Sequence, residues 1–321
     1  MLKVCPRCGE PRILAPECPQ CGVLYAKAEA RAARAASSEP APVLATGPVP
    51  AAPLEPSPSL EATGWTGDLE DARHELRLRL FALPGMLLVA WLLIHSPMWG
   101  RLMRIFLTMW VHELGHAVSA WFCGFPSIPG PWVTTTWDEP SLVVTALLAT
   151  GFMTLVFRGF VTKQRVLVAA GATGLLLQFV GTGLLPFSSA RQLIIFGGDG
   201  GQLVLGTLLL TTLYAPRESS LRQGWLHWGY MVIGAAAFTE TFSQWWATRR
   251  DFSLIPFGSM EGVGLSDPSK LVEQYGWGEL QLIHRYNALG LACLAGLALL
   301  YTVGVVRARA ALQRLERRHG A

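Results

Sequence analysis

The stretch MWVHELGHAVSAWFCGF, residues 109–125, places His112, Glu113 and His116 in an otherwise apolar segment. Ionisable groups are costly to bury in such a segment, and where they occur they usually have a function. Residues four apart lie on one face of a helix, so both imidazoles could bind one zinc ion. Glu113 would then accept a proton from a zinc-bound water. The alternative is that the histidines only form hydrogen bonds to neighbouring helices, but the spacing favours the zinc site.

A zinc ion held by two histidines needs a third protein ligand if a fourth position is to stay open for water or substrate. Asp199 is the candidate, because it stands alone in the apolar segment IIFGGDGGQLVLG, residues 194–206. A carboxylate in that setting is expensive unless a cation balances it. The four flanking glycines should loosen the helix and allow close approach to a neighbour. The alternative is a loop outside the membrane, which would leave Asp199 solvated.

Four cysteines near the N-terminus form a second candidate metal site. Cys5 and Cys8 make one C-x-x-C pair, and Cys18 and Cys21 make another. This spacing is typical of a zinc ribbon in which four thiolates enclose a structural zinc ion. No cleavable signal peptide precedes the cysteines, so we expect a reducing compartment, which disfavours the alternative of disulfides. Because a closed four-thiolate site has no open position, this head should be a structural platform or a partner-binding module.

The composition indicates which elements must position these groups. Of 321 residues, 51% are hydrophobic and 15% are charged, and the mean hydropathy is +0.35. That is too apolar for an ordinary soluble domain, and the net charge of +4 does not call for nucleic acid. We expect an all-α polytopic membrane protein with about six to eight transmembrane helices and a small N-terminal four-cysteine zinc ribbon. The predicted spans are residues 80–97, 102–123, 141–160, 165–186, 192–214, 226–247 and 286–306.

The domain organisation follows from these segments. The zinc ribbon takes residues 1–27, a Pro- and Ala-rich linker takes 28–67, the transmembrane domain takes 68–306 and a basic tail takes 307–321. Basic clusters precede the first span, divide the third from the fourth and the fifth from the sixth, and follow the last. Basic residues gather on the cytosolic side, yet three predicted spans separate the first two clusters. One of the three should therefore be re-entrant or wrongly divided, and the Pro-containing first segment is the weakest.

The chain resembles a known family at these motifs. A membrane-embedded HELGH followed two or three spans later by Asp-Gly-Gly in an apolar segment is similar to the site-2 protease family of intramembrane zinc metalloproteases. The resemblance covers about residues 80–215 and rests on His112, Glu113, His116 and Asp199. It implies that the two histidines and Asp199 bind the catalytic zinc and that Glu113 is the general base. It also implies a substrate that is a transmembrane or membrane-proximal segment of another protein.

We therefore expect an intramembrane zinc metalloendopeptidase with one catalytic and one structural zinc ion. Its partners would be a membrane-protein substrate, the lipid bilayer and a cytosolic protein bound by the ribbon, with no nucleic acid. It should lie in the bacterial inner membrane with the ribbon in the cytosol.

Two other functional classes compete with the protease. One is a catalytically inactive scaffold of the same fold, and the other is a metal or proton transporter in which Asp199, Glu240 and the histidines act as relays. The intact Glu113 disfavours the scaffold, since zinc binding alone does not need it. The lack of an internal repeat disfavours the transporter. For Glu240 itself, a structural hydrogen bond is the favoured interpretation.

Overall fold

The structure, a computed structural model, describes residues 67–216, 219–222, 224–260 and 264–319, together with Val4, Pro11, Cys18, Pro19 and Tyr25. The chain divides into two compact units, Met1–Ala62 and Thr63–Ala321. In the first unit Cys18 is buried and Val4 pairs with Pro11 in an isolated antiparallel bridge. The predicted ribbon and linker otherwise lie outside the described residues, as do Cys5, Cys8 and Cys21. The ribbon therefore stays a prediction.

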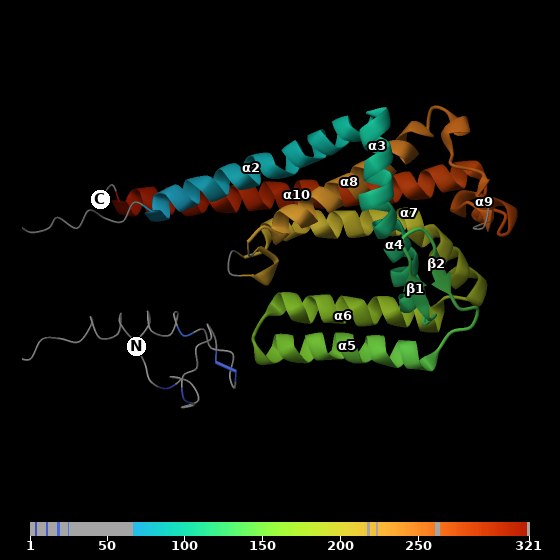
Figure 1. Ribbon diagram of the computed structural model, residues 1–321, viewed down its shortest axis with the longest axis horizontal. Coiled ribbons are helices and arrows are strands. Elements are labelled where there is room, and N and C mark those ends of the chain that lie inside the picture. The colour runs from blue at the N-terminus through green and yellow to red at the C-terminus, as the bar shows by residue number, and fades with distance from the viewer. Residues whose placement is uncertain are drawn as a thin grey trace, which may run out of the picture. The chain divides into compact units, whose positions relative to one another are not determined.

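The second unit is built from helices with two short β-hairpins between them (Figure 1). Its helices are α2 (Gly67–Ile94), α3 (Pro97–Met103), α4 (Met109–Phe122), α5 (Leu142–Val161), α6 (Arg165–Phe179), α7 (Phe187–Thr211), α8 (Leu226–Ala247), α9 (Asp267–Glu273) and α10 (Glu279–His319). The π-helical turns are η1 (Arg104–Thr108) and η2 (Val180–Leu184), and the 3-10 turns are η3 (Thr212–Tyr214), η4 (Ser220–Arg222) and η5 (Phe252–Leu254). The antiparallel hairpins pair β1 (Ser127–Pro129) with β2 (Thr134–Thr136), and β3 (Ser259–Met260) with β4 (Gly264–Leu265).

Five helices in the described ranges are long and apolar enough to cross a membrane. They are Asp68–Ile94, Leu142–Val161, Arg165–Leu184, Phe187–Tyr214 and Glu279–His319. Much of their apolar surface points outward: on α5, Leu142, Leu147 and Phe160 are 88%, 69% and 68% exposed. Such a surface is unfavourable in water, whereas lipid tails solvate it and a helix satisfies its own backbone groups. The protein is therefore an all-α membrane protein.

Two predicted spans are absent from this set. Residues 102–123 fall short because His112, Glu113 and His116 lower the hydropathy of the segment, which also contains the π turn η1. Aromatic and polar residues do the same to α8, although it extends over 22 residues. The described chain thus has five qualifying helices where we predicted six to eight. By contrast, the Pro-containing segment that looked weakest is part of an uninterrupted α2, with Pro84 inside it.

The direction of the helices is compatible with an even number of crossings between the basic clusters. In Figure 1, α3 and α4 run across the long helices, whereas α2, α5, α6, α7, α8 and α10 lie roughly along one direction. If α2 and α5 each cross the membrane, two crossings separate the first basic cluster from the second, which is an even number as the charge pattern requires. The α5–α6 and α7–α8 connections lie at the same end of the unit as the start of α2 and the basic end of α10 (Figure 1). The segment 102–123 is the one that does not run along the others.

The helix α7 is central to the packing, since it contacts α4, α8, α9 and α10. One buried cluster joins α2, α7, α8 and α10 through residues such as Leu203, Leu210, Met231 and Leu297. A second buried cluster holds α9 in place; its members are Trp245, Ile255, Leu271, Trp277, Leu282, Ile283 and Tyr286. Burial of these large apolar side chains fixes the connection between α8 and α10 against the helices.

Candidate metal centre

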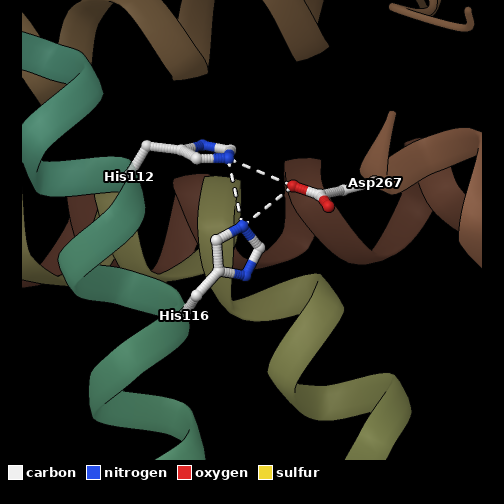
Figure 2. A group of neighbouring side chains, drawn as sticks. All are labelled: His112, His116 and Asp267. Carbon is white, nitrogen blue, oxygen red and sulfur yellow. Dashed lines mark hydrogen bonds and ion pairs between the residues drawn. The ribbon is translucent and has the colours of Figure 1, made fainter. Parts of the chain in front are cut away.

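The helix α4 presents His112 and His116 on successive turns. Their ring centroids are 4.8 Å apart with an interplanar angle of 84°, and their Nε2 atoms are 3.2 Å apart. Figure 2 shows both imidazoles directed to the same point. The i, i+4 spacing therefore brings the two nitrogens together as the sequence predicted.

The third group at this point is Asp267, the first residue of α9. Its Oδ2 lies 3.1 Å from Nε2 of His112 and 2.9 Å from Nε2 of His116 (Figure 2). Among the described residues, these three form a group that could hold a metal ion. The start of α9 is fixed by Ser266, whose side chain accepts a hydrogen bond from the backbone N–H of Ser269. Helix capping and the burial of α9 thus aim Asp267 at the histidines.

The surroundings of Asp267 favour its ionised form. Burial alone would raise the pKa of the Asp267 carboxyl, but the neighbouring His116 and His112 outweigh it and hold this pKa well below its usual range. The Nζ atom of Lys270 also lies 3.2 Å from Oδ1. A metal ion binds the ionised carboxylate, so the group is in the required state at neutral pH.

The other ring nitrogens decide which atoms face the centre. Nδ1 of His116 lies 2.7 Å from the backbone carbonyl oxygen of Ile194, and Nδ1 of His112 lies 3.0 Å from Oδ1 of Asp199. Both oxygens only accept hydrogen bonds, so each Nδ1 carries a proton and donates, and Nε2 of each ring faces the Asp267 carboxylate. The two Nε2 atoms and Oδ2 of Asp267 therefore lie within hydrogen-bond distance of one another. A metal ion at the centre would replace any proton on the two Nε2 atoms and would interact with all three ligand atoms.

The geometry also fits a zinc ion. The three contacts of 2.9, 3.1 and 3.2 Å make a nearly equilateral triangle. Ligand atoms about 2.0–2.1 Å from a tetrahedral zinc ion are about 3.3 Å apart, so the triangle matches one slightly contracted face of that tetrahedron. The fourth corner has no ligand-type side chain among the residues described. Two imidazoles, one carboxylate and an open position make a donor set that catalytic zinc accepts.

Asp199 lies beside this group and is not part of it. Its Oδ1 contacts Nδ1 of His112, and its Oδ2 accepts a hydrogen bond of 2.8 Å from Nε1 of the buried Trp245. The third member of the group in the structure is therefore Asp267, and Asp199, which we predicted as the third ligand, lies behind His112. A carboxylate behind an imidazole fixes the orientation and tautomer of the ring. Asp199 is positioned for that role.

The alternative of a solvated loop at Asp199 is wrong. The helix α7 runs without interruption from Phe187 to Thr211, and the Asp199 side chain is only 17% exposed. The glycines therefore do not loosen the helix as we expected. They do allow close approach: a Cβ on Gly115 would lie 2.2 Å from the Gly197 carbonyl oxygen, and one on Gly201 would lie 2.4 Å from Cα of Gly115. Small residues on both helices bring α7 against the histidines.

We did not predict Asp267 as a candidate ligand, because no local pattern in the sequence identifies it. It lies 155 residues after His112, in the sequence SDPSK. A capping serine followed by Asp and Pro is the usual start of a surface helix, where an acidic residue complements the helix dipole. Nothing local distinguishes this aspartate from a capping residue.

Gly198 lies against the Nε2 atoms of His112 and His116 and provides a test of the candidate centre. A Cβ there would lie 2.6 Å from Nε2 of both His112 and His116, in the space that an ion and its ligands occupy. Gly198→Ala should therefore reduce the zinc bound at this site to well below one ion per chain, measured by elemental analysis of purified protein. The matched control is Gly151→Ala in α5, where a Cβ meets open space and Ala should be neutral or slightly stabilising. Equal zinc contents in the two variants would contradict the placement of the ion.

Glu113 lines the same cavity as the three candidate ligands, and the cavity has a volume of about 720 Å³. The residue is 5% exposed, and its backbone carbonyl oxygen accepts a hydrogen bond of 2.7 Å from Thr134. Within the described ranges its carboxylate has no hydrogen bond or ion pair. Thr108 also lines this cavity. A carboxylate without a competing partner in this cavity is available to accept a proton.

The chain matches no protein-family model, no curated protein and no solved structure. A fold by itself does not specify a chemistry, so the functional argument depends on the residues of the site.

Proposed function

We propose that this protein is an intramembrane zinc metalloprotease similar to the site-2 protease family, with His112, His116 and Asp267 as zinc ligands. The observation that carries the proposal is the meeting of two Nε2 atoms and a carboxylate oxygen at 2.9–3.2 Å. Glu113 beside the first histidine would be the general base. A structural zinc site would use four protein ligands, so a three-ligand group favours catalysis.

Different residues of the chain would transfer the proton and orient the zinc ligands. A zinc ion bound here would polarise the scissile carbonyl and acidify a water molecule. Glu113 accepts the proton of that water as its oxygen attacks the carbonyl carbon, and it passes the proton to the amide nitrogen as the C–N bond breaks. Asp199 and the Ile194 carbonyl hold the protons on the two Nδ1 atoms, which keeps each Nε2 directed at the centre.

The substrate class we infer is a segment of a membrane protein near the membrane surface. The cavity is lined by α4, α7 and α8, and also by residues of the α4–α5 and α8–α10 connections such as Trp132, Thr134, Phe257 and Leu265. A site between spanning helices and their connections is accessible to water and to a peptide leaving the lipid. A helical carbonyl is shielded by its own hydrogen bond, so an unwound segment is the form that would be cut.

The proposed orientation places the basic end of the unit in the bacterial cytosol, on the same side as the predicted ribbon. The basic residues at this end include Arg158 and Arg165 at the α5–α6 connection, Arg222 in η4 and the last turn of α10. The α4–α5 and α8–α10 connections, which line the cavity, lie at the opposite end (Figure 1). By the positive-inside rule, cleavage would then occur towards the extracytosolic surface.

Cysteine labelling tests this orientation with a matched pair of exposed glutamines. Gln164 lies in the α5–α6 connection and Gln274 follows α9. In spheroplasts, a membrane-impermeant maleimide should label Gln274→Cys and should label Gln164→Cys only after lysis. The parent protein supplies the background from its own cysteines. The reverse pattern would overturn the orientation but would leave the metal site unaffected.

Zinc analysis combined with hydrolysis tests the function. The purified parent should contain zinc beyond that of the ribbon, and in liposomes it should cleave a single-span membrane protein. A chelator should stop cleavage and added zinc should restore it. His116→Ala should lose one zinc ion per chain together with all cleavage. A His116→Ala variant with the zinc content of the parent would contradict the proposed zinc site and the proposed function.

A further inference from the structure

A second polar cluster in the same cavity involves Arg104, Thr108 and Glu240. Oε1 of Glu240 accepts a hydrogen bond of 2.5 Å from Nε of Arg104, and its Oε2 accepts a short hydrogen bond from the Thr108 hydroxyl. The side-chain amide of Gln202 lies 3.4 Å from the same Oε2. The favoured interpretation of Glu240 as a hydrogen-bonded residue is thus confirmed. The proton-handling or gating role is not needed to account for it.

The cluster holds the Arg104 guanidinium in one orientation. The Glu240 side chain is 9% exposed, so its charge is costly unless it is paired. Arg104 and Thr108 are the first and last residues of the π turn η1, and both reach Glu240 from there. π turns are frequent at functional sites, where they redirect side chains.

The terminal Nη1 and Nη2 atoms of the Arg104 guanidinium remain open to the cavity. Its side chain is 56% exposed, and within the described ranges no hydrogen bond or ion pair engages its Nη1 and Nη2 atoms. Two other basic side chains that line the cavity already interact with carboxylates of the protein. The Nη2 atom of Arg191 donates to Asp138, and Lys270 contacts Asp267. Arg104 therefore presents a pair of parallel N–H donors, the arrangement that matches a carboxylate.

The distance from Arg104 to the histidines along the helix indicates how far from the cleaved bond a group bound by Arg104 would lie. Arg104, Thr108, His112 and His116 follow one another at intervals of four along η1 and α4, and all four line the cavity. Eight helical residues advance about 12 Å between the Cα atoms of Arg104 and His112. An extended peptide covers that distance in about three to four residues.

We propose that Arg104 binds a carboxylate of the peptide substrate, about three to four residues from the cleaved bond, with Glu240 as the residue that positions the guanidinium. The inference rests on the proposed function and adds a substrate preference to it. The carboxylate belongs to an Asp or Glu side chain or to the C-terminus of the peptide, and both present the same two oxygens.

A binding experiment tests this proposal without requiring cleavage. Glu113→Gln protein, loaded with zinc in detergent, is titrated with a fluorescent ten-residue Ala- and Leu-rich peptide that carries one Asp and an amidated C-terminus. The Asp peptide should bind at least about tenfold more tightly than its Asn counterpart, as for a charge-assisted hydrogen bond that is well oriented. Arg104→Gln in the same background should reduce this ratio to about one, and Arg104→Lys should retain only part of it. An all-neutral peptide with a free or an amidated C-terminus separates the two sources of carboxylate.

The controls distinguish a binding residue from a structural ion pair. Arg249→Gln alters an arginine that stacks 3.9 Å over Trp246 and does not line the cavity, and it should keep the Asp/Asn ratio of the parent. Glu240→Gln should lower the ratio while zinc content stays unchanged, because the guanidinium loses its anchor. Equal affinities for the Asp and Asn peptides and for both C-terminal forms would overturn the carboxylate site, even if hydrolysis by the parent is established. An unchanged ratio in Arg104→Gln would also overturn it.

Discussion

Glu113→Gln should lower the rate of peptide hydrolysis by about 10²–10⁴-fold, the usual contribution of a general base. The amide has the size of the carboxylate but cannot accept the water proton at neutral pH. Glu113 lines the metal cavity and its carboxylate has no described partner, so the substitution removes no hydrogen bond or ion pair of the described structure. The folded protein and its zinc ion should therefore persist. Cleavage of a single-span substrate in liposomes, followed over time by mass spectrometry, measures the loss.

Zinc content and melting temperature, measured on the same preparation, separate a chemical effect from a structural one. Parent-like values together with lost hydrolysis identify Glu113 as the proton acceptor. Glu113→Asp provides a graded control, because it keeps the carboxylate but withdraws it by one methylene. Hydrolysis at the parent rate in Glu113→Gln would exclude Glu113 as the base.

Asp267→Asn should release the catalytic zinc during dialysis, whereas Asp199→Asn should retain it with an affinity reduced by about 10–100-fold. A catalytic zinc site depends on three protein ligands, and Asp267 supplies the only oxygen in the group with His112 and His116. Asp199 contacts His112 at the nitrogen remote from the centre. Loss of a partner at that position typically weakens metal binding by the smaller factor. Competition with a zinc chelator of known affinity measures both variants.

The matched control for this pair is Asp251→Asn. Asp251 lies in the same α8–α10 connection, caps η5 through Ser253 and does not line the cavity, so zinc affinity should equal that of the parent. The two ligand variants should also differ in the increase in melting temperature on adding zinc, because an ion that binds only the folded chain stabilises it. If Asp199→Asn released zinc and Asp267→Asn kept it, the original assignment of Asp199 would be restored.

Local features of the chain were predicted correctly from the sequence. The apolar composition and long apolar segments indicated a membrane protein, because the match between hydrophobic length and bilayer thickness depends only on neighbouring residues. The spacing of His112 and His116 predicted that their imidazoles meet, since helix geometry alone brings residues four apart together. The glycines around Asp199 predicted close contact between helices, because the absence of a side chain is itself what permits it.

The structure differs from our predictions in features that depend on long-range packing and that no local sequence pattern indicates. Residues 102–123 were counted as a span from their length, but the three ionisable residues lower their hydropathy, and the direction of α4 across its neighbours is visible only in the structure. Asp199 was favoured as a ligand because its apolar surroundings made an unbalanced charge expensive. The imidazole of His112 and the indole of Trp245 satisfy that carboxylate in the folded protein.

The sequence by itself therefore determined the class of protein, the pairing of the two histidines on one helix face and the presence of Glu113 beside them. All of these depend on helix periodicity and on the cost of placing polar groups in lipid. The tertiary structure decided at which end of the helices the cavity lies. It also decided that the Asp267 carboxylate faces the two Nε2 atoms and that the Asp199 carboxylate lies behind His112. Asp267 reaches the centre because a buried aromatic cluster holds α9 against α7, and long-range packing of this kind leaves no periodic signal in the chain.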